Sequence, residues 1–442
     1  MLKKAKKVSE IPSAFPPLPL MKDEFDDFYI PVDSERDSCL SRIEELKGKL
    51  EQDNIKILFA GHRGSGKSTE LNRVIGDIGD QALIIQFSVM EELDINDINY
   101  IDLIMVMMEK LADEAVNNGI IKQDNENIKK IKFWLSDVTE IKEEDTAYQM
   151  EVAAGLKADR GILSLFLGLI AEFKASVRSA STNKVEYRQK LEKRISVLRY
   201  YCNVLINEIE IKLREQDKWL LLIIEDLDKA EISKIREIFF EHSGILSELN
   251  TRIIFTVSVF AFLTPSLADL KSKFRMVRLP MLKVKDNSRK DFEEGINAIE
   301  RIVGKRTELS LFENGLLRKI ILRSGGVLRD LFEMVELAAN SAYFNKRKKI
   351  TEEDADYAFN RLKSRYHSMI TVPDESKNRI NTKDLYDKLA EISKSETRKF
   401  PLDDTMRLLL SCLAVVEYNG EQWFDIHPAV DKLLKEMGKI NG

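Results

Sequence analysis

The chain has 442 residues, of which 44% are hydrophobic and 32% are charged. This length exceeds one ordinary hydrophobic core, so we expect two or three domains. The formal net charge of −5 is small for the length and excludes a surface that is basic throughout, so any contact with nucleic acid must be local. Three distant cysteines (Cys39, Cys202 and Cys412) and four histidines show no zinc-binding spacing, and a reducing, cytoplasmic location fits them best.

The N-terminal region carries four lysines but no secretory signal, because a proline-rich stretch (11–20) follows them instead of a long apolar run. These lysines indicate a mobile tail. The most apolar run of the chain, 162–170, is far too short to span a membrane and predicts a buried helix face. We therefore expect no membrane span.

Five short apolar runs predict the strands of a parallel sheet that is buried on both faces, because none of them alternates strictly between apolar and polar residues. The runs are 55–60, 82–89, 220–224, 252–258 and 274–281. Helical patterns lie between most of them. This order predicts an α/β fold with a three-layer core around a parallel sheet, and a helical insertion where the second and third runs are far apart.

Four regions are expected along the chain: an N-terminal extension (1–35), the α/β core (36–287, with the helical insertion at about 91–215), a helical lid (288–370) and a winged-helix-like domain (371–442). Thr351 and Asp354 predict a helix N-cap in the lid. In the last region the pattern reads helix, helix, hairpin, helix, with an Asn419-Gly420 turn in the hairpin.

The segment 61–69 matches the phosphate-loop pattern G-x-x-x-x-G-K-[ST] and lies between an apolar strand and a helix, which predicts that the three-layer α/β core (36–287) is that of a P-loop NTPase. Glycines let the backbone wrap around phosphate, and the inward-pointing amides with the helix N-terminus attract the anion. Lys67 is expected to neutralise the β and γ phosphates, and Ser68 to ligate Mg²⁺. The predicted nucleotide-binding residues of the loop are Gly61, His62, Arg63, Gly64, Ser65, Gly66, Lys67, Ser68 and Thr69.

Acidic residues follow the third apolar run directly, as in a Walker B strand. Position favours Glu225 as the metal-side acid and Asp226 as the base that polarises the attacking water. A shifted alternative places Asp226 on the metal and Asp228 nearby. Acids crowded after a buried strand are costly without a cation, so the pattern favours a metal site.

Two further segments hold polar groups that can reach the γ phosphate. Thr256 or Ser258 ends the fourth apolar run, and Arg329 lies one turn into the helix that follows Ser324-Gly325-Gly326. The Ser-Gly-Gly sequence resembles the signature of transporter ATPases, but that signature precedes the Walker B acids and this sequence follows them. The transporter interpretation is therefore rejected. The guanine-specific motif Asn-Lys-x-Asp is absent from the sequence, which favours ATP over GTP.

Together these motifs resemble AAA+ ATPases of the origin-recognition and replication-initiator type. The chain is more similar still to the bacterial STAND-like ATPases related to them, many of which lie in mobile-element and phage-defence loci. The segments that carry the resemblance span most of the chain and occur in the expected order: Phe28-Tyr29 with 33–36, then 61–71, 221–229, 253–258, 324–330 and 418–428.

The resemblance implies roles for matching residues. Thr256 or Ser258 would be sensor 1, Arg329 would be sensor 2 on the helical lid, and Tyr29 and Arg36 would lie near the adenine. Lys273 stands where an arginine finger would be expected, with Arg275 two residues on. The resemblance therefore implies an ATPase that is slow or stimulated by a partner.

Two functions follow from these patterns. Residues 381–442 carry nine Lys/Arg against eleven Asp/Glu, a net of −2, and an acidic wing should be repelled by DNA. The first hypothesis is therefore an ATP-dependent switch that assembles or recruits protein partners or copies of itself, in antiviral defence. The alternative is a DNA-binding initiator or transposition regulator that uses the basic run 346–349. A phosphotransferase is a weaker third option, because no acceptor motif is visible.

Overall fold

The computed structural model describes residues 2–32, 42–140, 161–178, 182–259, 267–372, 380–418 and 423–441. Its centre is a five-stranded parallel sheet of order β2-β3-β4-β1-β5. The strands are β1 (Lys56–Gly61), β2 (Ala82–Ser88), β3 (Trp219–Glu225), β4 (Arg252–Val257) and β5 (Arg275–Leu279). All five predicted strands are present, and the predicted three-layer α/β fold is confirmed.

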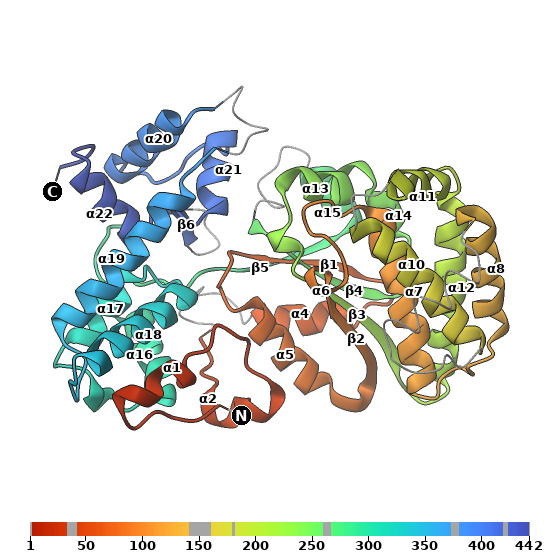
Figure 1. Ribbon diagram of the computed structural model, residues 1–442, viewed down its shortest axis with the longest axis horizontal. Helices are drawn as coiled ribbons and strands as arrows, with labels where there is room; N and C mark the ends of the chain where they lie inside the picture. Colours follow the sequence, from red (N-terminus) through yellow and green to blue (C-terminus); the bar gives the residue numbers. More distant parts are fainter. Residues whose placement is uncertain are drawn as a thin grey trace.

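Helices cover both faces of this sheet (Figure 1). On one face, α4 (Arg42–Leu50) and α5 (Lys67–Ile78) bury leucines against the apolar side chains of β1, β3 and β5. On the other face lie α13 (Ile232–Arg236), α14 (Ser243–Ser247) and α15 (Leu267–Lys273). There Phe239, Phe255 and Phe274 form an edge-to-face cluster with centroids 5.2–6.2 Å apart. Burial on both faces explains why the strands read as continuous apolar runs.

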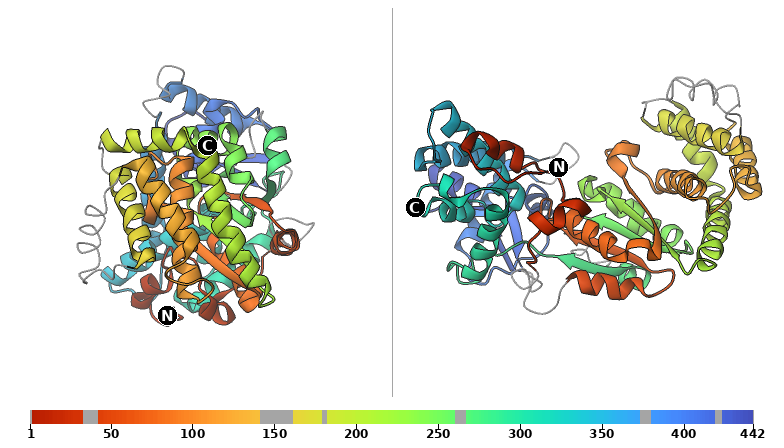
Figure 2. Two further views of the ribbon diagram at one scale, coloured as in Figure 1. Left: turned by 90° about the vertical axis from the view of Figure 1, so that its right-hand side faces the viewer. Right: turned by 90° about the horizontal axis from the view of Figure 1, so that it is seen from below.

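The predicted helical insertion between β2 and β3 is confirmed as a group of helices at one end of the molecule (Figures 1 and 2). The apolar run 162–170 lies in α10, where Phe166, Leu169 and Ile170 are buried as expected. Among the described helices, none is long and apolar enough to cross a membrane. The helices of this group are α6 (Val89–Glu92), α7 (Tyr100–Asn117), α8 (Glu126–Thr139), α10 (Ile162–Arg178), α11 (Thr182–Glu192) and α12 (Ile195–Arg214).

The lid consists of α16 (Glu293–Arg306), α17 (Leu316–Arg323), α18 (Leu328–Phe344) and α19 (Glu352–Met369). Thr351 and Asp354 form the expected capping box at the start of α19. The lid and the C-terminal region lie together at the end of the sheet opposite the insertion (Figure 1).

The N-terminal segment does not form the expected mobile tail. Ala5 pairs with Thr307 in the lid, and Val8, Ile11 and Ala14 are buried. This segment includes α1 (Ile11–Ala14) and α2 (Phe25–Phe28). Its apolar residues pack on α18, so burial of these side chains outweighs the charge of the exposed lysines. The prediction erred because it weighed the lysines and not the apolar residues between them.

The C-terminal region has the expected order of helix, helix, hairpin, helix. Its elements are α20 (Thr382–Lys394), α21 (Asp404–Ser411), the antiparallel strands β6 (Val415–Tyr418) and β7 (Trp423–Ile426), and α22 (Pro428–Glu436). The Asn419-Gly420 turn itself lies outside the described residues.

Candidate nucleotide-binding site

The predicted phosphate loop connects β1 to α5 and has the backbone that an anion site needs. Gly64 and Gly66 adopt φ of +79° and +98°, a region that side chains with a Cβ rarely enter. At Gly61 a Cβ would lie 2.8 Å from the Leu279 carbonyl oxygen, so the close approach to β5 requires glycine. Helix α5 begins at Lys67, and its first amides have no partner within the helix. The loop thus leads into the amides of a first helical turn and the positive end of the helix.

The side chain of Lys67 is buried beneath this loop. Its ammonium donates to the carbonyl oxygens of Gly61 and His62, both at 3.1 Å, and forms an ion pair of 2.8 Å with Asp228. The side chains of Lys67 and Asp228 are only 7% and 8% exposed. A nucleotide phosphate would replace part of this set, so the lysine is held ready beside the position that a phosphate would take.

The three acids after β3 have different partners. Glu225 accepts a hydrogen bond of 2.5 Å from Gln86 of β2. Asp226 accepts one of 2.6 Å from the Ser88 hydroxyl and pairs with Lys229 at 2.7 Å. Asp226 is partly buried, which raises its pKa, but these bonds from Lys229 and Ser88 bring the pKa below its ordinary value. Asp226 is therefore ionised at neutral pH, with Lys229 on one carboxylate oxygen and the Ser88 hydroxyl on the other.

The sensor candidates differ in position. Thr256 lines the cavity described below, and its hydroxyl accepts the amide of Asp226 at 2.9 Å. This bond supports the left-handed backbone of Asp226, with φ of +71°. Ser258 is buried two residues farther on, outside the cavity lining. Arg329 does line the cavity, and its Cβ lies 3.0 Å from where a Cβ on Gly64 would be. Arg329 and Thr256 therefore both line the cavity, with Arg329 against the phosphate loop and Thr256 against Asp226, whereas Ser258 is not part of the lining.

The oxygen ligands at this edge of the sheet suit Mg²⁺, which prefers carboxylates, hydroxyls, water and substrate phosphates. Ser68, Glu225 and Asp226 all line the cavity. Within the described residues no cluster of three or more His, Cys, Asp or Glu could hold a metal alone. Donors of this kind fit a Mg²⁺ that arrives with the nucleotide phosphates.

A cavity of about 430 Å³ joins these groups to an apolar region. Tyr29 lies in the lining, and its hydroxyl donates to Glu70 at 2.9 Å and accepts from Arg73 at 2.7 Å. Arg36 lies outside the described residues. The apolar part of the lining comes from the N-terminal segment and the lid, namely Pro17, Leu18, Pro19, Leu20, Phe28, Ile30, Val32, Ile302, Leu328 and Phe332.

The predicted loop residues do not all face this cavity. Gly64, Gly66, Lys67, Ser68 and Thr69 line it, whereas Gly61, His62, Arg63 and Ser65 complete the loop outside the lining. The Thr69 hydroxyl accepts the Leu20 amide at 3.2 Å, which fixes the N-terminal segment over the site. Lys273, at the expected finger position, donates to the Ser243 hydroxyl at 2.8 Å.

The C-terminal hairpin contacts the phosphate loop directly, which the sequence did not indicate. The amide of Glu417 in β6 donates to Nε2 of His62 at 2.9 Å, and the Glu417 carboxylate pairs with Arg278 of β5 at 2.6 Å. Glu417 is 3% exposed. Burial, with the charges of Lys67 and Arg278, lowers the pKa of His62 to about 3, so its ring is neutral and can accept this bond.

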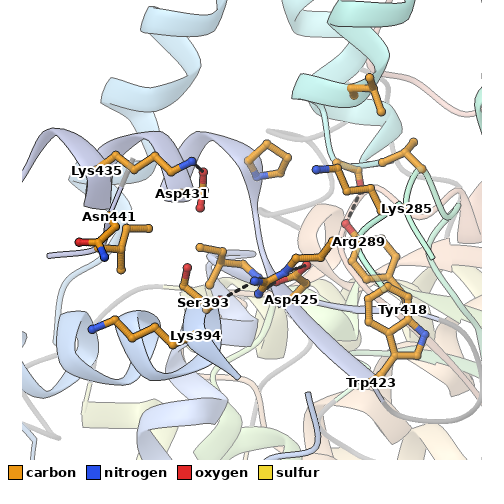
Figure 3. A pocket seen from close by; sticks show the side chains of 16 residues that line it. Lys285, Arg289, Ser393, Lys394, Tyr418, Trp423, Asp425, Asp431, Lys435 and Asn441 are labelled. Atoms are coloured by element: carbon orange, nitrogen blue, oxygen red, sulfur yellow. Dashed lines mark hydrogen bonds and ion pairs between the residues drawn. The ribbon is translucent and has the colours of Figure 1, made fainter. Parts of the chain in front are cut away.

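The same hairpin is bonded to the lid beside Arg329. The Tyr418 hydroxyl donates to the Gly325 carbonyl oxygen at 2.6 Å, and Arg289 pairs with Asp425 at 2.9 Å (Figure 3). His427 accepts the Ala429 amide on Nδ1, so Nε2 carries the proton and lies 3.0 Å from the Ser324 carbonyl oxygen and 3.3 Å from Asp330. The C-terminal region therefore contacts both the phosphate loop and the start of α18, the helix that carries Arg329.

No protein-family model matches this chain, and no curated protein matches it. Solved structures do resemble it. Cdc6p of Pyrobaculum aerophilum is 12% identical over 95% of this chain and 99% of its own, with a TM-score of 0.38. A Walker-type ATPase of Pyrococcus abyssi is 15% identical over 96% and 99%, with a TM-score of 0.44. The ORC1 protein of Aeropyrum pernix, solved in complex with DNA, is 13% identical over 96% of each chain, with a TM-score of 0.39.

These neighbours are of the same kind as the proteins that the sequence motifs resemble, and each match runs along nearly the whole chain. Their identities and TM-scores are low.

Proposed function

We propose that this protein is an ATP-dependent switch, in which binding and hydrolysis of Mg·ATP change how the C-terminal region is held on the core. The observation that carries the proposal is the position of the phosphate loop. One side of the loop borders the nucleotide cavity through Lys67, and the other side bonds to the C-terminal hairpin through His62. A change in the loop backbone at the nucleotide cavity would therefore alter the hydrogen bond between His62 and the hairpin.

The binding chemistry follows from the cavity lining. Loop amides and Lys67 would hold the β and γ phosphates, and Arg329 would reach them from the lid. When bound, Mg²⁺ would neutralise phosphate charge, held by Ser68 and one of the acids. Either Glu225 or Asp226 can take the metal side; the bond from Ser88 and the pair with Lys229 position Asp226 next to Thr256, where a base would stand.

The switch chemistry follows from the ion pair of Lys67 with Asp228. A phosphate that draws Lys67 away also withdraws its bond to the His62 carbonyl oxygen, in the residue that accepts the hairpin amide. At the same time Arg329 would move toward the phosphates. The next residue, Asp330, is the partner of His427. Two attachments of the C-terminal region, at His62 and at Asp330, are thus adjacent to groups that a triphosphate would attract.

The output of the switch is proposed to be recruitment of a protein partner or a second copy. The acidic wing expected from the sequence consists of Glu417, Glu421 and Asp425, of which Glu421 lies outside the described residues. Glu417 and Asp425 do not face DNA as free acids, because they pair within the fold with Arg278, Arg289 and Arg398. Their pairing weakens the charge argument against the DNA-binding alternative. The DNA-binding alternative is favoured by the exposure of Lys346, Lys348 and Lys349. The fourth residue of this basic run, Arg347, pairs with Asp354.

The test compares the full chain with no nucleotide, with Mg·ADP and with Mg·ATP. Hydrogen exchange of residues 415–418 should change with Mg·ATP, and the sedimentation coefficient should report any assembly. Lys67→Ala is the matched control and should show neither response. Identical exchange in all three states, in protein that binds ATP, would refute the switch. Salt-sensitive DNA binding lost on changing Lys346, Lys348 and Lys349 to Gln would select the alternative output.

A further inference from the structure

Arg306 is a buried cation that has no role in the phosphate and metal binding proposed above. It ends α16, is 4% exposed and lines the nucleotide cavity. Its NH1 group donates to the Ala14 carbonyl oxygen at 3.0 Å, but its Nε is buried without a hydrogen-bond partner. A buried donor without a partner costs free energy, so its presence calls for an explanation.

Arg306 has one carboxylate named in its electrostatic surroundings, Glu24, whose charge opposes the lowering of the Arg306 pKa by burial. Among the described residues, no carboxylate forms an ion pair with it; its guanidinium carbon lies 4.6 Å from the ring centroid of Phe332 and 5.9 Å from that of Phe15. Burial lowers the pKa of Arg306 to about 10, so it stays charged at neutral pH. The two rings hold the guanidinium in place but leave its Nε–H without an acceptor.

Arg306 borders the apolar part of the cavity and is displaced along α18 from Arg329, the residue that packs on the phosphate loop. Its neighbour Phe332 comes three residues after Arg329 on α18, which corresponds to roughly 4.5 Å along a helix axis. Arg329 packs against Gly64 of the phosphate loop. The cavity near Arg306 is bordered by Phe28, Ile302 and Phe332, apolar side chains that suit a flat aromatic ring.

We propose that Arg306 is a specificity-determining residue, whose guanidinium recognises the purine base of the bound nucleotide by donating an N–H to an acceptor nitrogen of the ring. The inference rests on the proposed nucleotide binding. Arginine has donors only, so its partner must be an acceptor, and adenine offers ring nitrogens at positions 1, 3 and 7. The apolar border favours the base over the hydrated ribose.

The test measures the affinity of the full chain for Mg·ATP, for Mg·tripolyphosphate, which has no base, and for the 1-, 3- and 7-deaza analogues of ATP. Arg306→Met should weaken Mg·ATP about 10- to 100-fold, the range for a hydrogen bond to a charged group, and leave Mg·tripolyphosphate within about twofold. Arg301→Met, on an exposed position of the same helix, is the control and should change neither. Arg306→Lys should lose affinity for Mg·ATP about as much as Arg306→Met, because an ammonium lacks the fixed planar geometry of the guanidinium donors.

In the wild type, one deaza analogue should bind about as weakly as ATP binds to Arg306→Met, and that analogue should lose nothing more in the variant. An equal loss of ATP and tripolyphosphate would overturn the inference, since it would show a general charge effect or a disturbed fold. Equal binding of all three deaza analogues and ATP by the wild type would overturn it as well, whether or not the variants fold. If the wild type bound Mg·tripolyphosphate but not Mg·ATP, the base contact alone would be contradicted. If the wild type bound neither, the proposed nucleotide-dependent function would be contradicted as well.

Discussion

Replacing Arg278 by Met should release the C-terminal hairpin from the core. Arg278 lies in β5 and pairs at 2.6 Å with Glu417, whose side chain is 3% exposed. Loss of one partner leaves a buried carboxylate without compensation, which costs about 3–5 kcal/mol. Undocking of the hairpin returns Glu417 to water, so most of this cost should appear in the docking equilibrium and not in the stability of the sheet.

A loss of about 3 kcal/mol corresponds to a roughly 150-fold larger undocked fraction, because each 1.4 kcal/mol is a factor of ten. The amide of Glu417 reports this equilibrium directly, since it donates to His62 across the interface. Its hydrogen exchange should therefore accelerate up to about 150-fold in Arg278→Met, while the amides of β1 stay protected. Acid should partly restore protection, because a protonated Glu417 tolerates burial.

The control is the double variant Arg278→Met with Glu417→Met, which replaces the ion pair by apolar side chains and leaves the His62 contact intact. Such replacements are often neutral or stabilising, so protection should return. The explanation would be refuted by exchange at Glu417 that stays slow in the single variant, or by an equal acceleration in the single and double variants.

Three further outcomes follow from the same contacts. Burial and the charges of Lys67 and Arg278 lower the pKa of His62 to about 3, against about 6.5 in the unfolded chain. The stability that neutral His62 contributes is therefore complete above pH 6.5 and is lost as the pH is lowered. From pH 7 to 5 it should fall by about 2 kcal/mol in urea unfolding, and a wild-type loss no larger than that of His62→Gln would contradict this. Asp226→Asn should keep Mg·ATP affinity but hydrolyse ATP roughly 100-fold more slowly; unchanged phosphate release would exclude Asp226 as the base. Gly326→Ala should prevent docking of the lid, because its Cβ would meet the Leu282 carbonyl oxygen at 1.9 Å with φ of +81°; a melting curve like the wild type would count against the close approach.

Much of the fold could be predicted because its signals are local. The strands are apolar runs without alternation, which is what burial on both faces imposes, and the phosphate loop is one continuous motif. The hairpin was visible in the same way from its two flanking strands. Thr351 and Asp354 lie three residues apart, so their capping box was also readable along the chain.

The contacts missed by sequence reasoning join distant segments. Arg306 meets Ala14 across 292 residues, and the Glu417 amide meets His62 across 355. An acid such as Glu417 looks like a solvated wing residue until Arg278 is placed beside it. For Arg306 a weak signal existed, since an arginine at the end of an apolar helix face, followed by Thr307, lies on the buried side of α16.

The central claim is that the loop around Gly64 and Lys67 binds Mg·ATP. Titration calorimetry of the full chain with Mg·ATP, run in parallel on Lys67→Ala, tests it most directly, with thermal unfolding to show that both are folded. The expected result is one bound nucleotide per wild-type chain and no measurable heat for the variant. A folded wild type that takes up no Mg·ATP, or a variant that binds it equally well, would contradict the claim.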